Sequence, residues 1–300
     1  MQFKRPKRPV NGVLLLDKPA GISSNQALQK AKHLFMAAKA GHTGSLDPFA
    51  TGLLPLCFGE ATKFSHTLLD ADKSYAATLR LGAISTTGDT EGEITQLAEV
   101  AVTMADIKRI MPQFHGEISQ VPPMYSALKH QGKALYEYAR AGVEIERAAR
   151  RVTIRNLTVT RFEPPHLDIE VSCSKGTYIR TLAEDIGHAL GCGAYLTALR
   201  RLKTGNFDLA RAVTLEQLES RAPEQRDALL LPPDALLADL PQAELNADSA
   251  FYLCQGQAIW LPGKRALGEI RLYDTNHRFL GLGEVMPDGK IAPRRLVQMQ

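Results

Sequence analysis

The reactive group that stands out in this chain is a single carboxylate, Asp47, in the loop GHTGSLDPFATG from Gly41 to Gly52. The glycines of the loop permit positive φ angles, and Pro48 fixes φ directly after the acid. Apolar residues flank the loop, so the acid is predicted to lie on a half-buried surface. A reactive acid would be presented in this way, but the pattern also fits an ordinary turn whose Asp caps its own backbone.

One cation and one aromatic residue could complete a site with this acid. Arg180 stands in KGTYIRTL at a predicted helix start, and Tyr75 stands at a predicted strand start. Each has a plainer interpretation. Arg180 could pair with Glu184 one helical turn later, and Tyr75 could be a core residue of its strand.

The motifs of metal and cofactor sites are absent from the sequence. It contains no HExxH, no Walker A, no GxGxxG between a strand and a helix, and no GxSxG elbow. The four cysteines are far apart and form no CxxC pair, so we interpret them as small core residues. We therefore expect no metal and no cofactor, and chemistry performed by side chains.

Hydrophobic periodicity predicts the elements that must position these residues. Val10–Leu16 is a buried strand, and Ser23 with Gln26 forms a capping box that starts a helix. Further helices are expected at about 60–69, 104–111, 133–141 and 178–190, and strands at 53–58, 75–81, 152–162 and 167–173. The last two strands form a hairpin, with a bulge near Asn156 where the alternation slips. The pattern indicates an α+β fold with a mixed sheet flanked by helices.

Composition and charge limit the classes of protein. A chain of 300 residues with 44% hydrophobic and 23% charged residues is one large domain or two ordinary ones. Residues 1–180 carry 23 Lys/Arg against 17 Asp/Glu, residues 204–250 carry 3 against 9, and the last fifty carry 7 against 4. Two basic regions around an acidic connector suggest a polyanionic partner. Because no apolar run could span a bilayer or act as a signal peptide, we expect a cytoplasmic protein without membrane contact.

The ordered motifs of the chain resemble those of the bacterial tRNA pseudouridine synthase B family. They are NGVLLLDKPAGISS, GHTGSLDPFATGLLP, FGEATKF, DKSYAATLRLG, QVPPMYSALKHQGKALYEYARAG, CSKGTYIRTLAEDIGHALGCGAYLTALRR and GKIAPRR. The resemblance implies isomerisation of uridine 55 in the T loop of tRNA to pseudouridine. It also implies a pseudouridine synthase fold with a largely antiparallel central sheet, and a small C-terminal β-barrel of PUA type. We expect a catalytic domain at 1–205, a connecting segment at 206–245 and the RNA-binding domain at 246–300.

The resemblance also assigns roles to the charged residues. Asp47 matches the family's aspartate and would be the nucleophile. Arg180 matches the arginine that pairs with it, and a nearby cation would keep the acid ionised. Lys18 lies in the family's LDKP turn, where it could help to hold the site or be a surface lysine.

The remaining roles concern the base and the RNA. Tyr75 matches the tyrosine that stacks on the target base and is a candidate for removing the C5 proton. Tyr178 and Leu199 match residues that line the uracil pocket. His42 matches the histidine that enters the T loop where the uridine is withdrawn, by base flipping.

Three functions remain open at this point. The first is a monomeric tRNA pseudouridine synthase that binds the T stem-loop. The second is a tRNA-binding or folding protein in which catalysis is incidental. The third is a hydrolase with paired carboxylates, for which no motif supplies a second acid.

Overall fold

The first strand and helix of the computed structural model, which describes residues 7–97 and 99–298, follow the apolar pattern directly. The predicted strand is β1 (Gly12–Lys18). Ser23 and Gln26 form the predicted capping box, with each side chain bonded to the other's backbone amide, at the start of α1 (Ser24–Leu34). Ala27, Leu28 and Ala31 of the helix are buried against β1 and β3.

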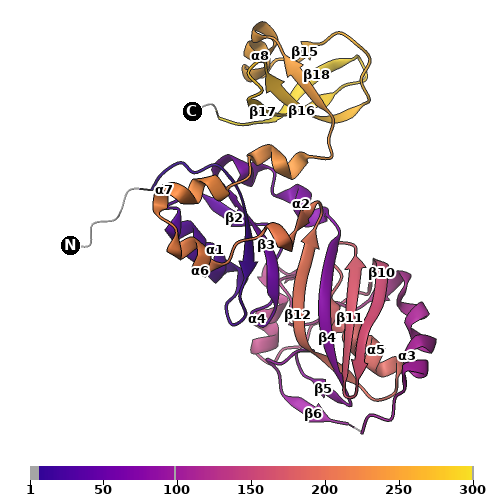
Figure 1. Cartoon of the computed structure of the whole chain (residues 1–300). Helices are drawn as coiled ribbons and strands as arrows, with labels where there is room; N and C mark the ends of the chain where they lie inside the picture. The colour runs from indigo at the N-terminus through magenta and orange to yellow at the C-terminus, as the bar shows by residue number, and fades with distance from the viewer. Residues whose placement is uncertain (1–6, 98, 299–300) are drawn as a thin grey trace.

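A nine-stranded sheet forms the main body of the molecule (Figure 1). Its central order is β1-β3-β12-β4-β11-β10-β7, while β2 pairs with β3 and β13 with β12. Only the β3–β12 pair is parallel, so the sheet is mixed and largely antiparallel, as predicted. The strands after β1 are β2 (Ala40–His42), β3 (Thr51–Phe58), β4 (Lys73–Leu81), β7 (Gly116–Gln120), β10 (Arg150–Glu163), β11 (His166–Cys173), β12 (Ala194–Thr204) and β13 (Phe207–Asp208).

The hairpin of β10 and β11 confirms the predicted bulge. The register shifts between Ile154 and Asn156, where the sequence alternation slips. Helix α5 (Ile179–Ala189) packs its apolar face on this sheet, and Gly191 follows it with a φ of 73°. Smaller elements stand around the sheet: β5 (Ala83–Ser85), β6 (Ile94–Gln96), α3 (Met104–Ile110), η2 (Met111–Phe114), β8 (Lys129–His130), β9 (Lys133–Ala134) and α4 (Leu135–Arg140).

The helix predicted over 60–69 is instead two short pieces, so that prediction was wrong in its continuity. A 3-10 helix, η1 (Gly59–Lys63), is followed by α2 (His66–Asp70). The break lies at Phe64, whose side chain is fully buried in the core between the sheet and the C-terminal part of the chain. Burial of this ring overrides the continuous helical pattern.

Residues 206–245, predicted as a connecting segment, form short helices that pack on the main body. They are η3 (Leu209–Arg211), α6 (Leu215–Ser220), α7 (Pro223–Arg226), η4 (Asp227–Leu229) and η5 (Pro233–Leu237). Leu215 and Leu218 are buried in the same cluster as α1. The segment therefore extends the hydrophobic core of the main body.

The C-terminal residues form a separate curled sheet of five strands in the order β14-β16-β17-β18-β15 (Figure 1). Its elements are β14 (Gln242–Leu245), α8 (Ala247–Cys254), β15 (Ile259–Trp260), β16 (Gly268–Asp274), β17 (Phe279–Val285) and β18 (Lys290–Leu296). The sheet has its own hydrophobic cluster. Its strands curl into a half-barrel, which agrees with the predicted small β-barrel of PUA type.

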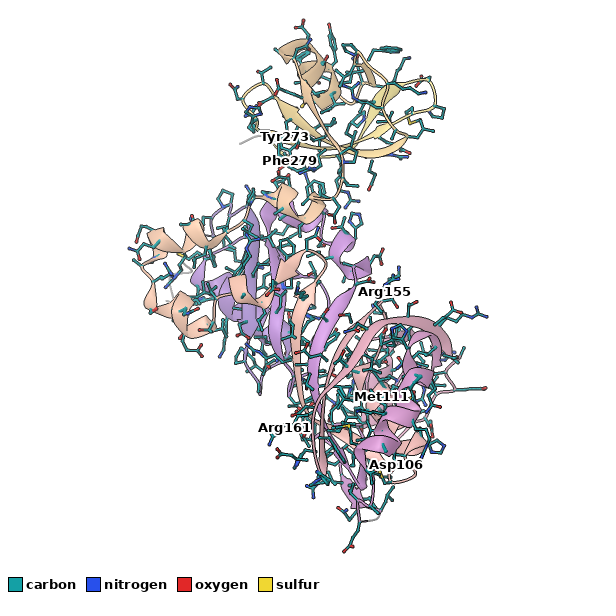
Figure 2. All side chains as sticks on the ribbon, turned by 45° about the vertical axis from the view of Figure 1, so that its right-hand side comes forward. Asp106, Met111, Arg155, Arg161, Tyr273 and Phe279 are labelled. Atoms are coloured by element: carbon teal, nitrogen blue, oxygen red, sulfur yellow. The ribbon has the colours of Figure 1, made fainter. Side chains whose placement is uncertain are left out.

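The C-terminal sheet contacts η1, the element that directly follows β3. The rings of Phe64 and Phe279 meet edge to face at 5.5 Å between centroids, and Lys63 Nζ donates to the Leu296 carbonyl at 2.8 Å. Figure 2 shows Phe279 and Tyr273 at the side of this sheet that faces the main body. The two parts are thus joined through apolar packing and hydrogen bonds between side chains and backbone.

None of the helices in the described residues has the length and apolar character needed to cross a membrane.

Candidate active site

The Asp47 loop connects β2 to β3 and is held by side chains from two other elements. Ser24 Oγ donates to the Leu46 carbonyl at 2.9 Å and accepts from the Leu46 amide at 2.7 Å. Lys18 Nζ donates to the Pro48 carbonyl at 3.3 Å. The residues on both sides of Asp47 are therefore tied to β1 and α1, which fixes the direction of its side chain.

The Asp47 carboxylate faces Arg180, and its Oδ2 lies 3.0 Å from Arg180 Nε. Only 5% of the Arg180 side chain is exposed, whereas 37% of the Asp47 side chain remains open. The arginine also donates to the Thr87 carbonyl at 2.9 Å and to the Tyr125 carbonyl at 2.7 Å. A guanidinium that is buried and held by two carbonyls thus forms an ion pair with a half-open carboxylate.

The pKa of Asp47 lies above its ordinary value, although Arg180 lies close to its carboxylate. Burial of the carboxylate is the largest cause, and Arg180 opposes it. Asp89 raises the pKa further, and Lys18 lowers it. Desolvation outweighs the ion pair because the loop lies against the apolar core. A carboxylate in this state is more basic than one in water.

Lys18 is fully buried, which excludes the surface-lysine interpretation. Its Nζ donates to the carbonyls of Pro19 at 2.9 Å and Ile22 at 2.7 Å, in addition to that of Pro48. Burial lowers the pKa of Lys18 to about 8, and the charge of Asp47 opposes this shift. The lysine joins the β1–α1 turn to the Asp47 loop.

Tyr75 and Leu199 lie on neighbouring strands in the hydrophobic cluster that also contains Leu46 of the Asp47 loop. Tyr75 pairs in register with Arg201 of β12, and Leu199 is 7% exposed. Burial raises the pKa of the Tyr75 hydroxyl, while the charge of Arg201 and a hydrogen bond with it lower the pKa. The structure therefore brings both residues to the inner side of the loop.

Tyr178 and His42 flank this centre. Tyr178 precedes α5, and its backbone amide donates to Gln120 Oε1 at 3.1 Å. Burial raises the pKa of its hydroxyl. His42 ends β2, its Nδ1 is buried without a hydrogen-bond partner, and burial lowers the pKa of its imidazole. The structure thus places His42 in the wall of the cleft with one ring nitrogen unpaired.

The centre opens into a cleft of about 1140 Å³, lined by His42, Asp47 and Arg180 among the predicted residues. The rest of its wall comes from the start of α1, residues 86–93, residues 125–127 and helix α4. Arg140 of α4 lies in this wall, with its guanidinium 5.4 Å from the centroid of the Tyr136 ring. The volume is large enough for a nucleotide and part of its strand.

Asp89 is a residue of the cleft that the sequence argument missed. Its side chain is 2% exposed and lies 3.5 Å from Arg180 Nη1. It accepts hydrogen bonds from Thr87 Oγ1 at 2.5 Å and from the Glu91 amide at 2.9 Å. The signal that could have identified it is the segment TTGDTEG, in which, as in the Asp47 loop, an acid stands among glycines and small polar residues.

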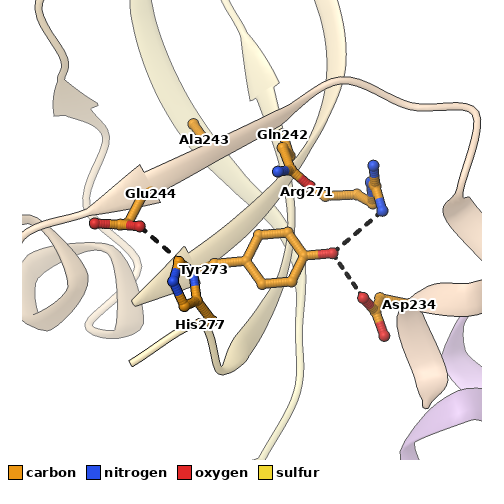
Figure 3. A pocket seen from close by; sticks show the side chains of 7 residues that line it. All are labelled: Asp234, Gln242, Ala243, Glu244, Arg271, Tyr273 and His277. Carbon is orange, nitrogen blue, oxygen red and sulfur yellow. Dashed lines mark hydrogen bonds and ion pairs between the residues drawn. The ribbon is translucent and has the colours of Figure 1, made fainter. Parts of the chain in front are cut away.

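A second, smaller hollow of about 340 Å³ lies at the C-terminal sheet and contains none of the predicted site residues (Figure 3). In it, Tyr273 donates its hydroxyl hydrogen to Asp234 at 2.7 Å and accepts from Arg271 at 3.3 Å. His277 Nδ1 lies 3.5 Å from Glu244. Across residues 7–97 and 99–298, no group of three or more His, Cys, Asp or Glu side chains is arranged to hold a metal ion.

Comparisons with known proteins agree along the whole chain. Residues 32–179 match the family model described as TruB family pseudouridylate synthase, N terminal domain. Residues 180–238 match the tRNA pseudouridylate synthase B C-terminal domain, and residues 241–297 match Pseudouridine synthase II TruB, C-terminal.

Individual relatives and a solved structure give the same result. The tRNA pseudouridine synthase B of Methylobacillus flagellatus is 61% identical over 298 residues, which cover 99% of each chain. That of Nitrosospira multiformis is 56% identical and covers 98% of this chain and 97% of the relative. A chain in the crystal structure of a Cbf5-Nop10-Gar1 complex superposes with a TM-score of 0.71 at 25% identity, covering 96% of this chain and 84% of that one.

Proposed function

The chain belongs to the TruB family of pseudouridylate synthases, and from this premise we propose that it isomerises uridine 55 in the T loop of tRNA to pseudouridine. The observation that carries the proposal is the Asp47 carboxylate at 3.0 Å from the buried Arg180, at the edge of a cleft that can admit a nucleotide. The reaction breaks the bond from C1′ to N1, turns the uracil, joins C1′ to C5 and releases the C5 proton. N1 takes up one proton in exchange for the proton lost from C5, so uridine and pseudouridine contain the same atoms and no electrons are gained or lost.

Asp47 acts as the nucleophile toward the extruded uridine. Its raised pKa supports this role, because a partly desolvated carboxylate is a stronger base and nucleophile than one in bulk water. Arg180 opposes the rise and fixes the direction of the carboxylate. Asp47 and Arg180 together thus provide a carboxylate that is reactive and held in one orientation.

The aromatic and apolar residues behind the loop receive the base. Flipping a base costs on the order of a few kcal/mol, and stacking on an aromatic ring returns about 1–3 kcal/mol. We assign this stacking to Tyr75, with Tyr178 and Leu199 as the lining of the uracil pocket and Tyr75 as a candidate for removing the C5 proton. His42, with its unused Nδ1, enters the space in the T loop that the flipped uridine vacates.

The division of the chain follows from the same assignment. We propose a catalytic domain at 1–205, a connecting segment at 206–245 and an RNA-binding domain of PUA type at 246–300, acting as a monomer in the cytoplasm. The separate core of the C-terminal sheet supports this division, although β14 of that sheet already begins at Gln242. The T stem-loop is the expected partner.

The decisive experiment replaces Asp47 by Asn and maps pseudouridine chemically in tRNA treated with the pure protein. We expect pseudouridine at position 55 with the unchanged protein, none with Asp47→Asn, and similar tRNA affinity for both. Asp239→Asn is the matched control, because Asp239 is exposed and shares only a side-chain hydrogen bond with Asn206. Turnover by Asp47→Asn would contradict the role of the acid.

The same samples test the other two functions. Free uracil released from the tRNA would indicate a hydrolase instead of an isomerase. Tight tRNA binding by the unchanged protein without any pseudouridine would indicate a binding or folding protein.

A further inference from the structure

A second arginine of the site, Arg201 of β12, is buried without a carboxylate partner. It is 1% exposed, and the described residues provide no ion pair for it. Taking a charge out of water without a counter-ion is costly unless its hydrogen bonds are well satisfied. The contacts that satisfy this guanidinium therefore indicate what it does.

The Arg201 guanidinium bonds to both ends of the Asp47 loop. Its Nε donates to the Leu53 carbonyl at 2.7 Å, after the acid in the chain. Its Nη1 and Nη2 donate to the carbonyls of Ser45 at 3.4 Å and Gly44 at 3.3 Å, before the acid. One planar group thus spans the base of the loop and closes it.

The same guanidinium reaches Tyr75 on the next strand. Arg201 and Tyr75 are paired in register between β12 and β4, which places their side chains on the same face of the sheet, and the interaction of the guanidinium with the hydroxyl lowers the pKa of Tyr75. The positive charge opposes the effect of burial on the Tyr75 hydroxyl. Arg201 therefore contacts both the loop that carries Asp47 and the tyrosine that is proposed to stack on the uracil.

We propose that Arg201 is a positioning residue that fixes the Asp47 loop and the Tyr75 hydroxyl relative to each other in the reactive geometry. The proposal rests on the proposed function, since it concerns the same reaction. Arg201 itself is enclosed by protein and does not contact the RNA. It acts through the carbonyls and the hydroxyl that it holds.

The geometry requires an arginine at this position. The fork of a guanidinium sends its N–H groups in fixed, divergent directions, whereas a lysine ammonium donates from one point on a flexible stem. Arg201→Lys keeps the charge but can reach only one end of the loop. Arg201→Gln keeps a small amide donor and removes the charge.

The test is single-turnover pseudouridine formation with the full-length variants in saturating excess over the tRNA. A titration with tRNA counts the correctly folded, binding-competent enzyme, and the rate constant reports the chemical step. We expect Arg201→Lys to keep the wild-type number of tRNA-binding sites and the wild-type tRNA affinity while its rate constant falls about 100-fold, the size of loss that a displacement of roughly 1 Å can cause. Arg155→Lys is the matched control, because Arg155 forms an exposed ion pair with Asp72 on an outer part of the sheet.

Two outcomes would overturn the proposal. One is a rate constant within threefold of the wild type. The other is a smaller number of tRNA-binding sites with an unchanged rate constant, which would assign Arg201 to folding alone. If Arg201→Lys does not fold by circular dichroism, Arg201→Gln is measured in its place with the same criteria. Absence of pseudouridine with the wild-type protein would instead contradict the proposed function.

A double variant tests the link to the tyrosine. If Arg201 acts partly through the Tyr75 hydroxyl, Tyr75→Phe should slow Arg201→Lys by a smaller factor than it slows the wild type. If Tyr75→Phe slows both proteins by the same factor, Arg201 does not act through the Tyr75 hydroxyl.

Discussion

Replacing Gly52 by Ala should displace the strand that follows the Asp47 loop. Gly52 has a φ of +102°, and a Cβ atom built there would lie 2.4 Å from the Arg201 carbonyl oxygen and 2.7 Å from the Arg201 nitrogen. Both are backbone atoms of β12, which is paired on its other side with β4 at Tyr75. The clash cannot be relieved by rotating a side chain, so β3 and β12 must separate.

The expected size of the effect follows from these contacts. The left-handed conformation costs an alanine roughly 1–2 kcal/mol, and overpacking costs about 1–3 kcal/mol more. With an unfolding entropy of about 2.1 cal/mol/K per residue, a loss of roughly 2–5 kcal/mol lowers the melting temperature by about 3–8 °C. Ordinary contact begins at 3.4 Å, so the strands must part by roughly 1 Å, which we expect to reduce the rate about 100-fold.

The assay combines thermal denaturation with release of tritium from C5-labelled uridine in tRNA, because forming the C1′–C5 bond expels that hydrogen. Gly256→Ala is the matched control, since Gly256 also has a positive φ, +86°, but no atom within 4 Å of the added Cβ. It should lose stability from the φ term alone and keep its activity. If Gly52→Ala melts and reacts like Gly256→Ala, the close approach of β3 and β12 is not the reason for the glycine.

Three further predictions concern charges and the C-terminal attachment. Burial lowers the pKa of Lys73 from 10.5 to about 8, so between these pH values the folded chain binds fewer protons than the unfolded chain. The unfolding free energy of the wild type, measured by urea denaturation, should therefore rise with pH relative to that of Lys73→Met. The expected slope is up to about 1.4 kcal/mol per pH unit between about pH 8 and 10. A difference between the two proteins that does not change with pH would contradict the lowered pKa of Lys73. Arg180→Lys loses the planar guanidinium that reaches Asp47 and two carbonyls. Because a hydrogen bond to a charged group contributes about 1.5–3 kcal/mol, the single-turnover rate should fall at least 10-fold. A wild-type rate would show that the positive charge alone is sufficient. Tyr273→Phe loses its hydrogen bond to Asp234 and should lower the unfolding free energy by about 1 kcal/mol. The rate at saturating tRNA should stay the same. A large fall in this rate would show that the C-terminal sheet takes part in the chemistry.

The local elements could be predicted because their signals are short-range. The capping box of Ser23 and Gln26 and the slipped alternation at Asn156 both lie within a few residues, and both are present in the structure. The helix over 60–69 failed because Phe64 is taken into a core built from distant parts of the chain. Local pattern predicts an element well until a long-range contact competes with it.

The site residues also fall into two groups, those that the sequence indicates and those that only the fold brings together. The loop around Asp47 is visible in the sequence as glycines and a proline around one acid, and the ordered motifs indicate the family and hence the chemistry. Nothing within the loop says that Arg180, far along the chain, lies 3.0 Å from it, or that Asp89 lies on the arginine's other side. Those distances depend on how strands and loops from separate segments meet.

The ordered motifs of the sequence were enough to predict the family, and apolar spacing was enough to predict the α+β class and to single out Asp47, because glycine, proline and apolar residues constrain the backbone locally. The electrostatics of the site, in contrast, depend on the folded arrangement. It buried Lys18 and Arg201, which donate to carbonyls on either side of the acid, and it raised the pKa of Asp47 where an ion pair alone predicts a lower one. The physical reason is desolvation, since the cost of removing a charge from water depends on everything that surrounds it and not on its neighbours in the chain.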